Sequence, residues 1–375
     1  MSAAGSPRRV SILLPCFVPN DAIGNDVFGM YEELSEAGYQ AEIFTSDCHD
    51  SYKPIARPVE SQPEEAWQSP DDVLIYHHAI GWPAGEEILR KTRNRVVIKY
   101  HNITPPRFFR PYAQNYVVAC EGGIEATGRI ARFRGATFWG DSEFNAGELI
   151  ELGAPPQRCR SLAPWHRIEQ LQQEPLDLET LKFYRDGSFN ILFVGAIKPN
   201  KGHANALRAF AAYKAIYGGP ARLILAGSFD PGLKEYYKAI QHLAQAAGVA
   251  ADTVFVESVS GACLRTLYQL ADLFLCVSEH EGFCVPLVEA MAFRAPILAW
   301  GATAVAETAG DAGIVWEEFD PLLFAESMDR IRNNPALAGA LAARGRLRYE
   351  QCFHPSAIRG KMRQLMREVE GETRG

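Results

Sequence analysis

The sequence lacks several patterns that identify common protein classes. None of its eight cysteines forms a CxxC pair, and Cys16, Cys276 and Cys284 lie within apolar runs, which is typical of reduced, buried thiols. Neither a GxxxxGK loop nor a GxGxxG turn occurs, so a P-loop NTPase and a dinucleotide-dependent dehydrogenase are not favoured. No run of about 18 apolar residues indicates a membrane span. The net charge of -7 argues against general binding of nucleic acids.

The length and composition of the chain are typical of a two-domain globular protein. The chain has 375 residues, of which 47% are hydrophobic, and this is too long for one ordinary core. The opening MSAAGSPRR is not followed by the apolar stretch of a signal peptide, because Pro15, Asn20 and Asp21 interrupt it. We therefore expect a cytoplasmic protein.

Short apolar runs alternate with segments of helix length along the chain. Runs of this kind are typical of strands that are buried on both faces of a parallel sheet. We predict strands at 10–16, 41–45, 73–77, 96–101, 136–140 and 159–163, and again at 190–195, 222–227, 253–257, 273–277, 295–300 and 313–316. The intervening segments are amphipathic, as in the stripe of Val27, Met30, Tyr31 and Leu34, which Gly38 ends.

Strand–helix alternation that occurs twice predicts an α/β protein with two doubly wound, Rossmann-like domains. We expect the first domain at 1–180, the second at 188–354, and a polar seam at 174–189. The segment 355–375 is predicted to be a helix that packs back on the N-terminal domain. Ligands of such sheets bind at the carboxyl ends of the strands, so the loops after the predicted strands are the candidate site.

Two of these loops suggest anion binding. After the first strand, Gly24 is expected in a turn before a helix capped by Asn25 or Asp26, where a ligand can approach the backbone closely, or where there is only a simple turn. After the seventh strand, Gly195 is followed by Lys198 and Lys201 and then by a helix. Two lysines at the positive end of a helix favour a phosphate or diphosphate, and the alternative is a solvated lysine loop.

The stretch EHEGFCVPLVEA, at 279–290, places two acids on either side of a predicted helix start. Glu281 stands in the loop, and Glu289 is expected near the end of the first helical turn, which Pro286 favours. The backbone amides of Gly282, Phe283 and Cys284 are predicted donors for anionic oxygens, while the two acids accept from sugar hydroxyls. The alternative is that both acids are capping and surface residues.

The same stretch resembles the E-x7-E motif of retaining GT-B glycosyltransferases of family 4, the glycosyl transferases group 1. The resemblance extends through FVGAIKPNKG, LILAGSFDPGLKEYY, VFVESVSGACLRTLYQLADLFLCVS and APILAWGATAVAETAGDAGIVW, and covers about residues 190–350. The N-terminal half matches more loosely, through the Gly24 loop, VIKYHN and GDSEFNAGEL. The resemblance implies the GT-B fold, in which two Rossmann-like domains face a central cleft, with the acceptor on the N-terminal domain and the nucleotide sugar on the C-terminal one.

The resemblance also implies residue roles. Glu289 would hold the ribose, and Glu281 would contact the donor sugar beside the amides of Gly282 and Phe283. Lys201 would neutralise the diphosphate, which the Gly24 loop would approach from the other domain. His101 matches the histidine near the reacting carbon, although a lone histidine is more often structural. These assignments make Glu281, His101 and Lys201 the predicted catalytic residues, and they place Gly195, Lys198 and Cys284 in the donor site.

Two positions depart from the family pattern. Ala196 stands where the family has an arginine, so a diphosphate cation is missing there unless Lys198 replaces it, as a charge without the bidentate fork. Cys284 stands where the family has glycine, and its side chain is expected to narrow the donor site. No DxD triplet occurs, which favours metal-free transfer over the metal-dependent GT-A alternative, and we expect no cofactor.

The sequence features that indicate an acceptor site are less specific. Arginines alternate with aromatic residues in two segments, which suggests a peripheral contact with an anionic membrane or a lipid diphosphate, or else ordinary solvated arginines. These residues are Arg107, Phe108, Phe109, Arg110, Tyr112, Arg129, Arg132, Phe133 and Arg134. His77, His78 and Trp82 follow another strand and offer a platform for a sugar ring, or interdomain packing.

The function predicted from these features is transfer of a hexose from a UDP- or GDP-sugar to a glycan or lipid-linked saccharide, without a metal, in the synthesis of cell-surface polysaccharide. The enzyme would work in the cytoplasm or at the inner face of the membrane, and no nucleic-acid partner is expected. Two other classes stay open. One is a nucleotide-sugar epimerase on the same scaffold, with a phosphorylase made unlikely by the short chain. The other is a non-catalytic binder, which Ala196 and Cys284 would allow.

Overall fold

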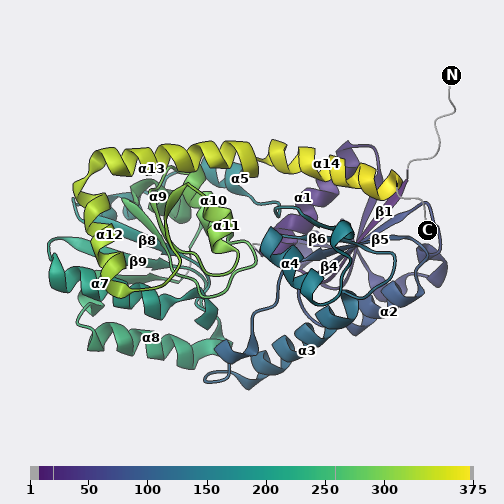
Figure 1. Ribbon diagram of the computed structural model, residues 1–375, viewed down its shortest axis with the longest axis horizontal. Coiled ribbons are helices and arrows are strands. Elements are labelled where there is room, and N and C mark those ends of the chain that lie inside the picture. Colours follow the sequence, from purple (N-terminus) through teal and green to yellow (C-terminus); the bar gives the residue numbers. More distant parts are fainter. Residues whose placement is uncertain (1–7, 20, 258, 372–375) are drawn as a thin grey trace. The chain divides into compact units, whose positions relative to one another are not determined.

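The computed structural model describes residues 8–19, 21–257 and 259–371, and the chain divides into two compact units (Figure 1). The first unit takes its described residues from Met1–Pro105, Val118–His166 and Pro355–Gly375. The second consists of the described residues of Pro106–Val117 and Arg167–His354. The segment 106–117 thus interrupts the first unit, although the sequence pattern places it within the N-terminal domain.

The first unit contains a parallel sheet in the order β3-β2-β1-β4-β5-β6-β7. Its described strands are β1 (Arg9–Phe17), β2 (Gln40–Cys48), β3 (Ala56–Pro58), β4 (Val73–His78), β5 (Arg95–Tyr100), β6 (Thr137–Gly140) and β7 (Cys159–Ser161). The six strands predicted here are all present. The short edge strand β3 was not predicted, since its three residues carry no apolar run.

The second unit repeats the arrangement with a parallel sheet in the order β10-β9-β8-β11-β12-β13. Its described strands are β8 (Phe189–Val194), β9 (Ala221–Ala226), β10 (Thr253–Val256), β11 (Leu273–Cys276), β12 (Ile297–Trp300) and β13 (Gly313–Trp316). All six were predicted, and the parallel pairing follows from the helices that connect successive strands. The α/β fold class is therefore confirmed.

Helices connect the strands of both sheets (Figure 1). In the first unit they are α1 (Ala22–Glu36), α2 (Pro83–Lys91), α4 (Glu143–Glu151) and α14 (Pro355–Gly371), while α3 (Gln114–Ile130) begins in the 106–117 segment. In the second unit they are α5 (Ile168–Gln173), α6 (Leu178–Tyr184), α7 (His203–Ile216), α8 (Lys234–Ala246), α9 (Gly261–Leu270), α10 (Val285–Ala292), α11 (Val305–Ala309), α12 (Pro321–Asn333) and α13 (Pro335–Arg348).

The last helix packs into the core of the first unit. The apolar stripe of α14 is buried there with residues of α1 and β1, and it consists of Ile358, Met362, Leu365, Met366 and Val369. Glu33 of α1 is almost fully buried and pairs with Arg359 and Arg363, each at 2.5 Å. Figure 1 shows α14 running beside α1. The contact joins the end of the chain to its beginning.

The start of α1 differs from the prediction. Its N-cap is Asp21, whose carboxylate accepts from the amides of Ile23 (3.2 Å) and Gly24 (3.1 Å), and not Asn25 or Asp26. Gly24 therefore lies in the first turn of the helix. A Cβ atom at Gly24 would lie 2.5 Å from the carbonyl oxygen of Val18, so the glycine is needed for a close backbone contact.

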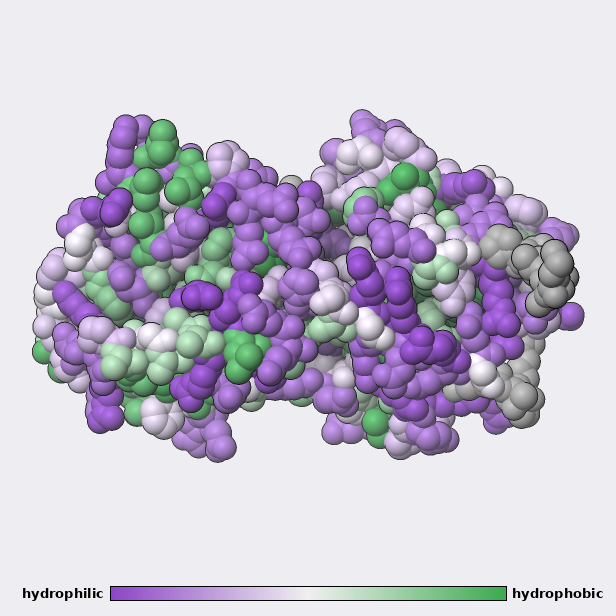
Figure 2. Space-filling view, turned by 90° about the horizontal axis from the view of Figure 1, so that it is seen from above, coloured by the Kyte–Doolittle hydropathy of each residue, from purple (hydrophilic) through white to green (hydrophobic). Residues whose placement is uncertain are grey.

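Hydrophilic residues dominate the face shown in Figure 2, where hydrophobic residues appear in separate patches. Among the described residues, no helix is both long enough and apolar enough to cross a membrane. This agrees with the absence of a long apolar run in the sequence.

Candidate functional site

The second sheet reverses its strand order between β8 and β11, and the two most distinctive loops of the sequence follow these two strands. Open α/β sheets bind ligands at such a switch point, beyond the carboxyl ends of the strands. The loop after β8 carries Lys198 and Lys201, and the loop after β11 carries Glu281. The sheet therefore brings together two loops that lie 80 residues apart in the sequence.

Lys201 and Glu281 form an ion pair at this point. The Lys201 ammonium donates to both carboxylate oxygens of Glu281, at 2.9 and 2.7 Å. The Glu281 side chain is 8% exposed and that of Lys201 is 25% exposed. Burial lowers the pKa of Lys201, but the Glu281 carboxylate outweighs this effect, and the net pKa lies above its usual value. Lys201 therefore stays charged across the physiological range of pH.

The backbone fixes the two loops against each other. The backbone carbonyl of Asn200 accepts from the amide of Glu279 at 2.8 Å. The side-chain amide of Asn200 donates to the carbonyl of His280 at 3.1 Å. Gly202 has φ +77 and caps α7, and a Cβ atom there would lie 1.9 Å from the carbonyl oxygen of Val277. These contacts fix the position of Lys201 relative to Glu281.

Glu289 lies further along α10 than predicted. It is the fifth residue of the helix and not part of the first turn, so the helix terminus does not account for its position. It accepts a hydrogen bond of 2.6 Å from the Tyr268 hydroxyl. Burial raises the pKa of Glu289, and the Tyr268 hydrogen bond partly offsets the shift. Tyr268 was not identified from the sequence, although its helix α9 leads directly into β11.

Cys284 is the N-cap of α10 in the left-handed region, with φ 78. A glycine adopts this conformation without the cost that a side chain incurs. The sulfur atoms of Cys284 and Cys276 lie 3.8 Å apart and both residues are buried. The hydrogen bond with Cys276, together with burial, raises the pKa of Cys284 well above its usual value, so the thiol stays protonated.

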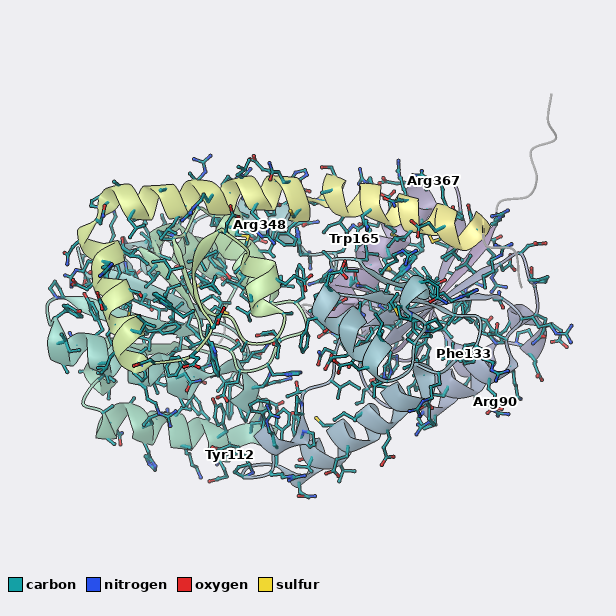
Figure 3. The ribbon with its side chains drawn as sticks, in the orientation of Figure 1. Arg90, Tyr112, Phe133, Trp165, Arg348 and Arg367 are labelled. Atoms are coloured by element: carbon teal, nitrogen blue, oxygen red, sulfur yellow. The ribbon has the colours of Figure 1, made fainter. Side chains whose placement is uncertain are left out.

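The aromatic segment at 106–117 belongs to the second unit. Tyr112, labelled in Figure 3, lies edge-on to Tyr236 with ring centroids 5.1 Å apart. Phe108 lies 6.3 Å from the ring of His280, the residue before Glu281, and Arg107 lies over Phe108 at 4.9 Å. The sequence suggested an acceptor or membrane surface on the N-terminal domain, but this half of it packs against the loop that contains Glu281.

The first unit holds a second polar group at its own switch point, between β1 and β4. His101 directly follows β5, and its Nδ1 lies 3.0 Å from the carboxylate of Asp141. Its Nε2 lies 2.8 Å from Nδ1 of His77, so both ring nitrogens of His101 have protein partners. Lys99 is fully buried and donates to Asp141 and, at 2.6 Å, to the carbonyl of Leu162. Asp26 of α1 completes the group. Sequence reasoning missed Asp26, Lys99 and Asp141.

A metal ion fits this group poorly. Asp26, His77 and His101 offer ligand atoms within 4.8 Å of one another, and this set of oxygen and nitrogen ligands would suit zinc. The Lys99 ammonium, however, lies 3.9 Å from the same oxygen of Asp26. A divalent cation would share a buried site with an ammonium, and like charges at that distance in a medium of low dielectric constant repel strongly. The group is better described as a hydrogen-bonded network.

Other residues singled out in the sequence are placed as follows. Trp82 is 6% exposed and belongs to the core of the first unit, stacked on Tyr76 with ring centroids 5.7 Å apart. His77 and His78 are also buried, so these three residues form no sugar platform. Arg129 forms a bidentate ion pair with Glu86, at 3.0 Å for each bond.

Comparison with known proteins identifies the class. Residues 182–348 match the model of the family Glycosyl transferases group 1. The predicted resemblance is confirmed over these residues. Sucrose-phosphate synthase from Thermosynechococcus elongatus has a similar structure, with a TM-score of 0.74 and 18% identity over 96% of this chain and 99% of that one. The fold is the GT-B fold of these glycosyltransferases.

Two further relatives show how far the similarity extends. The structure of HepE from Anabaena in complex with UDP and glucose gives a TM-score of 0.75 and 15% identity, over 96% of this chain and 100% of that one. The D-inositol 3-phosphate glycosyltransferase of Acidothermus cellulolyticus is 28% identical over 219 residues, which are 56% of this chain and 48% of the relative. The chain thus spans about half the length of the curated relatives that it matches.

Proposed function

We propose that the protein is a retaining glycosyltransferase that moves a hexose from a UDP- or GDP-sugar to a hydroxyl of a glycan or glycolipid without a metal ion. The observation that carries the proposal is the Lys201–Glu281 pair at the switch point of the second sheet. The family match over 182–348 and the UDP and glucose bound by HepE support a nucleotide-sugar donor. The product would belong to a cell-surface glycan, made at the cytoplasmic side of the membrane.

The proposed chemistry follows from the charges of the two loops. Departure of a nucleoside diphosphate leaves negative charge on its phosphate oxygens, and a fixed ammonium stabilises that charge best where water is excluded. Lys201 supplies the ammonium at the end of β8, with Lys198 in the same loop as a second cation. Because Ala196 offers no charge, Lys198 would take the place of the arginine of the family pattern.

Glu281 and Glu289 would bind the uncharged sugar and ribose of the donor. Glu281 accepts from hydroxyls of the transferred sugar once the diphosphate competes for Lys201. Glu289, which now accepts from Tyr268, would accept from the ribose. The amides of Gly282, Phe283 and Cys284, with Gly195 as a close backbone approach, complete the proposed donor site in the second unit. His101 would lie near the reacting carbon and would exchange its contact with His77 for a substrate hydroxyl.

Thermal unfolding with nucleoside diphosphates tests the donor site. UDP, GDP, ADP and dTDP are each added with EDTA at about 100 times the expected dissociation constant, where a ligand stabilises by about 2.7 kcal/mol. We expect one of UDP and GDP to raise the Tm by roughly 5 °C or more, since about 1 kcal/mol corresponds to 2–4 °C for domains of this size. A shift that appears only when EDTA is replaced by Mg²⁺ would contradict metal-free binding. No shift with any nucleotide would favour a degenerate cleft.

Incubation of the nucleotide sugar identified in this way separates enzyme from binder and from epimerase. Slow release of free sugar, with the anomeric configuration retained, is the expected result. Conversion to an epimeric nucleotide sugar, or binding without any turnover in the presence of lipid and glycan acceptors, would contradict the proposal.

Cys284→Gly tests whether the cysteine narrows the donor site. The change removes the strain of a left-handed side chain, of about 1–2 kcal/mol, and also its packing against Cys276, so a change in Tm of only a few degrees is expected. The number of sugars accepted with the preferred base should rise, measured as kcat/KM across UDP- or GDP-hexoses. Cys263→Gly, at the first turn of α9, is the control for loss of a cysteine. An unchanged ranking of sugars would refute the role of Cys284.

A further inference from the structure

The network in the first unit contains more negative than positive charge. Asp26 and Asp141 contribute two carboxylates, and the Lys99 ammonium offsets one of them. All three side chains are 7% exposed or less. With both histidines neutral, one negative charge would remain unpaired, and burial of an unpaired charge costs several kcal/mol. One additional proton would remove the imbalance.

The geometry of His101 provides a place for that proton. A carboxylate only accepts, so the Nδ1 of His101, 3.0 Å from Asp141, carries a hydrogen. The contact of 2.8 Å between its Nε2 and Nδ1 of His77 needs one more hydrogen, on either ring. Burial, followed by the charges of His101 and Lys99, lowers the pKa of His77 well below its usual value. His77 therefore acts as a neutral partner, and an added proton lies on His101 or on Asp26.

Asp26 is the second group that offers a site for the additional proton. Its Oδ1 accepts from the amide of Trp165 at 2.8 Å, and Trp165, labelled in Figure 3, packs against Gly29 on the same helix. Its Oδ2 is fully buried and has no hydrogen-bond partner. That oxygen lies 3.8 Å from His101 Nε2 and 3.9 Å from His77 Nδ1. Burial raises the pKa of Asp26 to about 6, although Lys99 and His101 act in the opposite direction.

We propose that Asp26 is a positioning residue for His101: its carboxylate lets the network hold one additional proton, shared between Asp26 and the imidazole of His101, and this proton fixes the orientation of the imidazole. The value of this role for transfer rests on the proposed function of His101. A charged ring donates stronger hydrogen bonds to a sugar hydroxyl or a leaving phosphate than a neutral one. The charged and titratable groups that face Asp26 are Lys99 of β5, His101 directly after β5 and Asp141 after β6, together with His77 of β4 and the amide of Trp165.

Asp26→Asn in the full-length chain provides the test, with the ring nitrogens of the histidines followed by ¹⁵N NMR from pH 5 to 9. The substitution keeps the hydrogen bond with Trp165 and removes one negative charge, so the network no longer requires the additional proton. The His101 signals, assigned by their loss in His101→Gln, should titrate at least about one pH unit lower than in the unmodified protein, a tenfold change in proton affinity.

Glu33→Gln is the matched control. Glu33 lies on the same helix and is 3% exposed, but it pairs with Arg359 and Arg363 of α14. This variant should lose stability and leave the His101 titration unchanged. Equal titration curves in Asp26→Asn and the unmodified protein would overturn the proposal, as would an equal shift in Glu33→Gln. If Asp26→Asn does not fold, Asp26→Ser provides the same comparison, since it removes the same negative charge with a smaller side chain.

Two further readouts separate this inference from the proposed function. If the protein transfers sugar, the acid limb of kcat should move to lower pH in Asp26→Asn with KM for the donor little changed. If it does not, the NMR shift still stands on its own. Metal analysis of the purified protein gives the alternative: a stoichiometric metal ion whose removal by EDTA changes the His77 and His101 signals would overturn the proposal.

Discussion

Lys201→Met should reduce donor turnover by roughly 10²–10³-fold, the effect of removing one preorganised charge donor from a site where negative charge develops. It should also destabilise the second unit, because Glu281 is left as a buried carboxylate without its cation. Breaking a buried ion pair costs about 3–5 kcal/mol, whereas an exposed one contributes about 0–1 kcal/mol. Since Lys201 is 25% exposed, we expect a cost between these limits, measured as a loss of Tm.

A double variant distinguishes lost pairing from lost packing. Lys201→Met with Glu281→Gln removes both charges, so it should be more stable than Lys201→Met alone even though it lacks activity. Lys214→Met is the matched control, because Lys214 is 22% exposed and pairs with Asp252 at 2.9 Å on another part of the same unit. Turnover by Lys201→Met within threefold of the unmodified enzyme, or an equal loss in Lys214→Met, would remove Lys201 from the proposed mechanism.

The central strands β4, β6 and β11 were predictable because they are buried on both faces and therefore read as apolar runs. The edge strand β3 was not, since Arg57 and Pro58 make two of its three residues polar or unable to donate. The start of α1 was misplaced for a related reason. Gly24 was interpreted as a turn residue, whereas it lies in a helix and packs against the carbonyl of Val18. A glycine in a sequence indicates a close backbone contact, but it does not show whether the glycine lies in a turn or in a helix.

The two polar groups differ in how far the sequence could reveal them. Lys201 and Glu281 each stand in a sequence motif that indicates a binding site. The pairing of β8 with β11 then brings the two residues together. The network around His101 draws on α1, β4, β5 and the loop after β6, and its members share no motif in the sequence. Lys99 within the buried run VIKY was the available signal, since a buried lysine needs a partner. Its partner, Asp141, lies 42 residues away.

Gly202→Ala should strongly disrupt the donor loops. The new Cβ atom would lie 1.9 Å from the carbonyl oxygen of Val277, and the residue has φ +77. Overpacking costs about 1–3 kcal/mol and a left-handed alanine about 1–2 kcal/mol, so a total of roughly 2–5 kcal/mol is expected. The Tm should fall by roughly 5 °C or more, and nucleotide binding should be lost with it.

Two glycines of the same unit separate the backbone strain from the clash. Gly218 has φ +62 and no atom within 4 Å of a new Cβ, so Gly218→Ala should show only the cost of the left-handed conformation. Gly339, inside α13, has neither constraint, and Gly339→Ala should stabilise by about 0.5–1 kcal/mol. The excess loss in Gly202→Ala over Gly218→Ala then measures the contact with Val277, whose displacement moves Glu281 away from Lys201. Equal losses in these two variants would mean that the β11 loop yields without strain, and that the position of Glu281 does not depend on this contact.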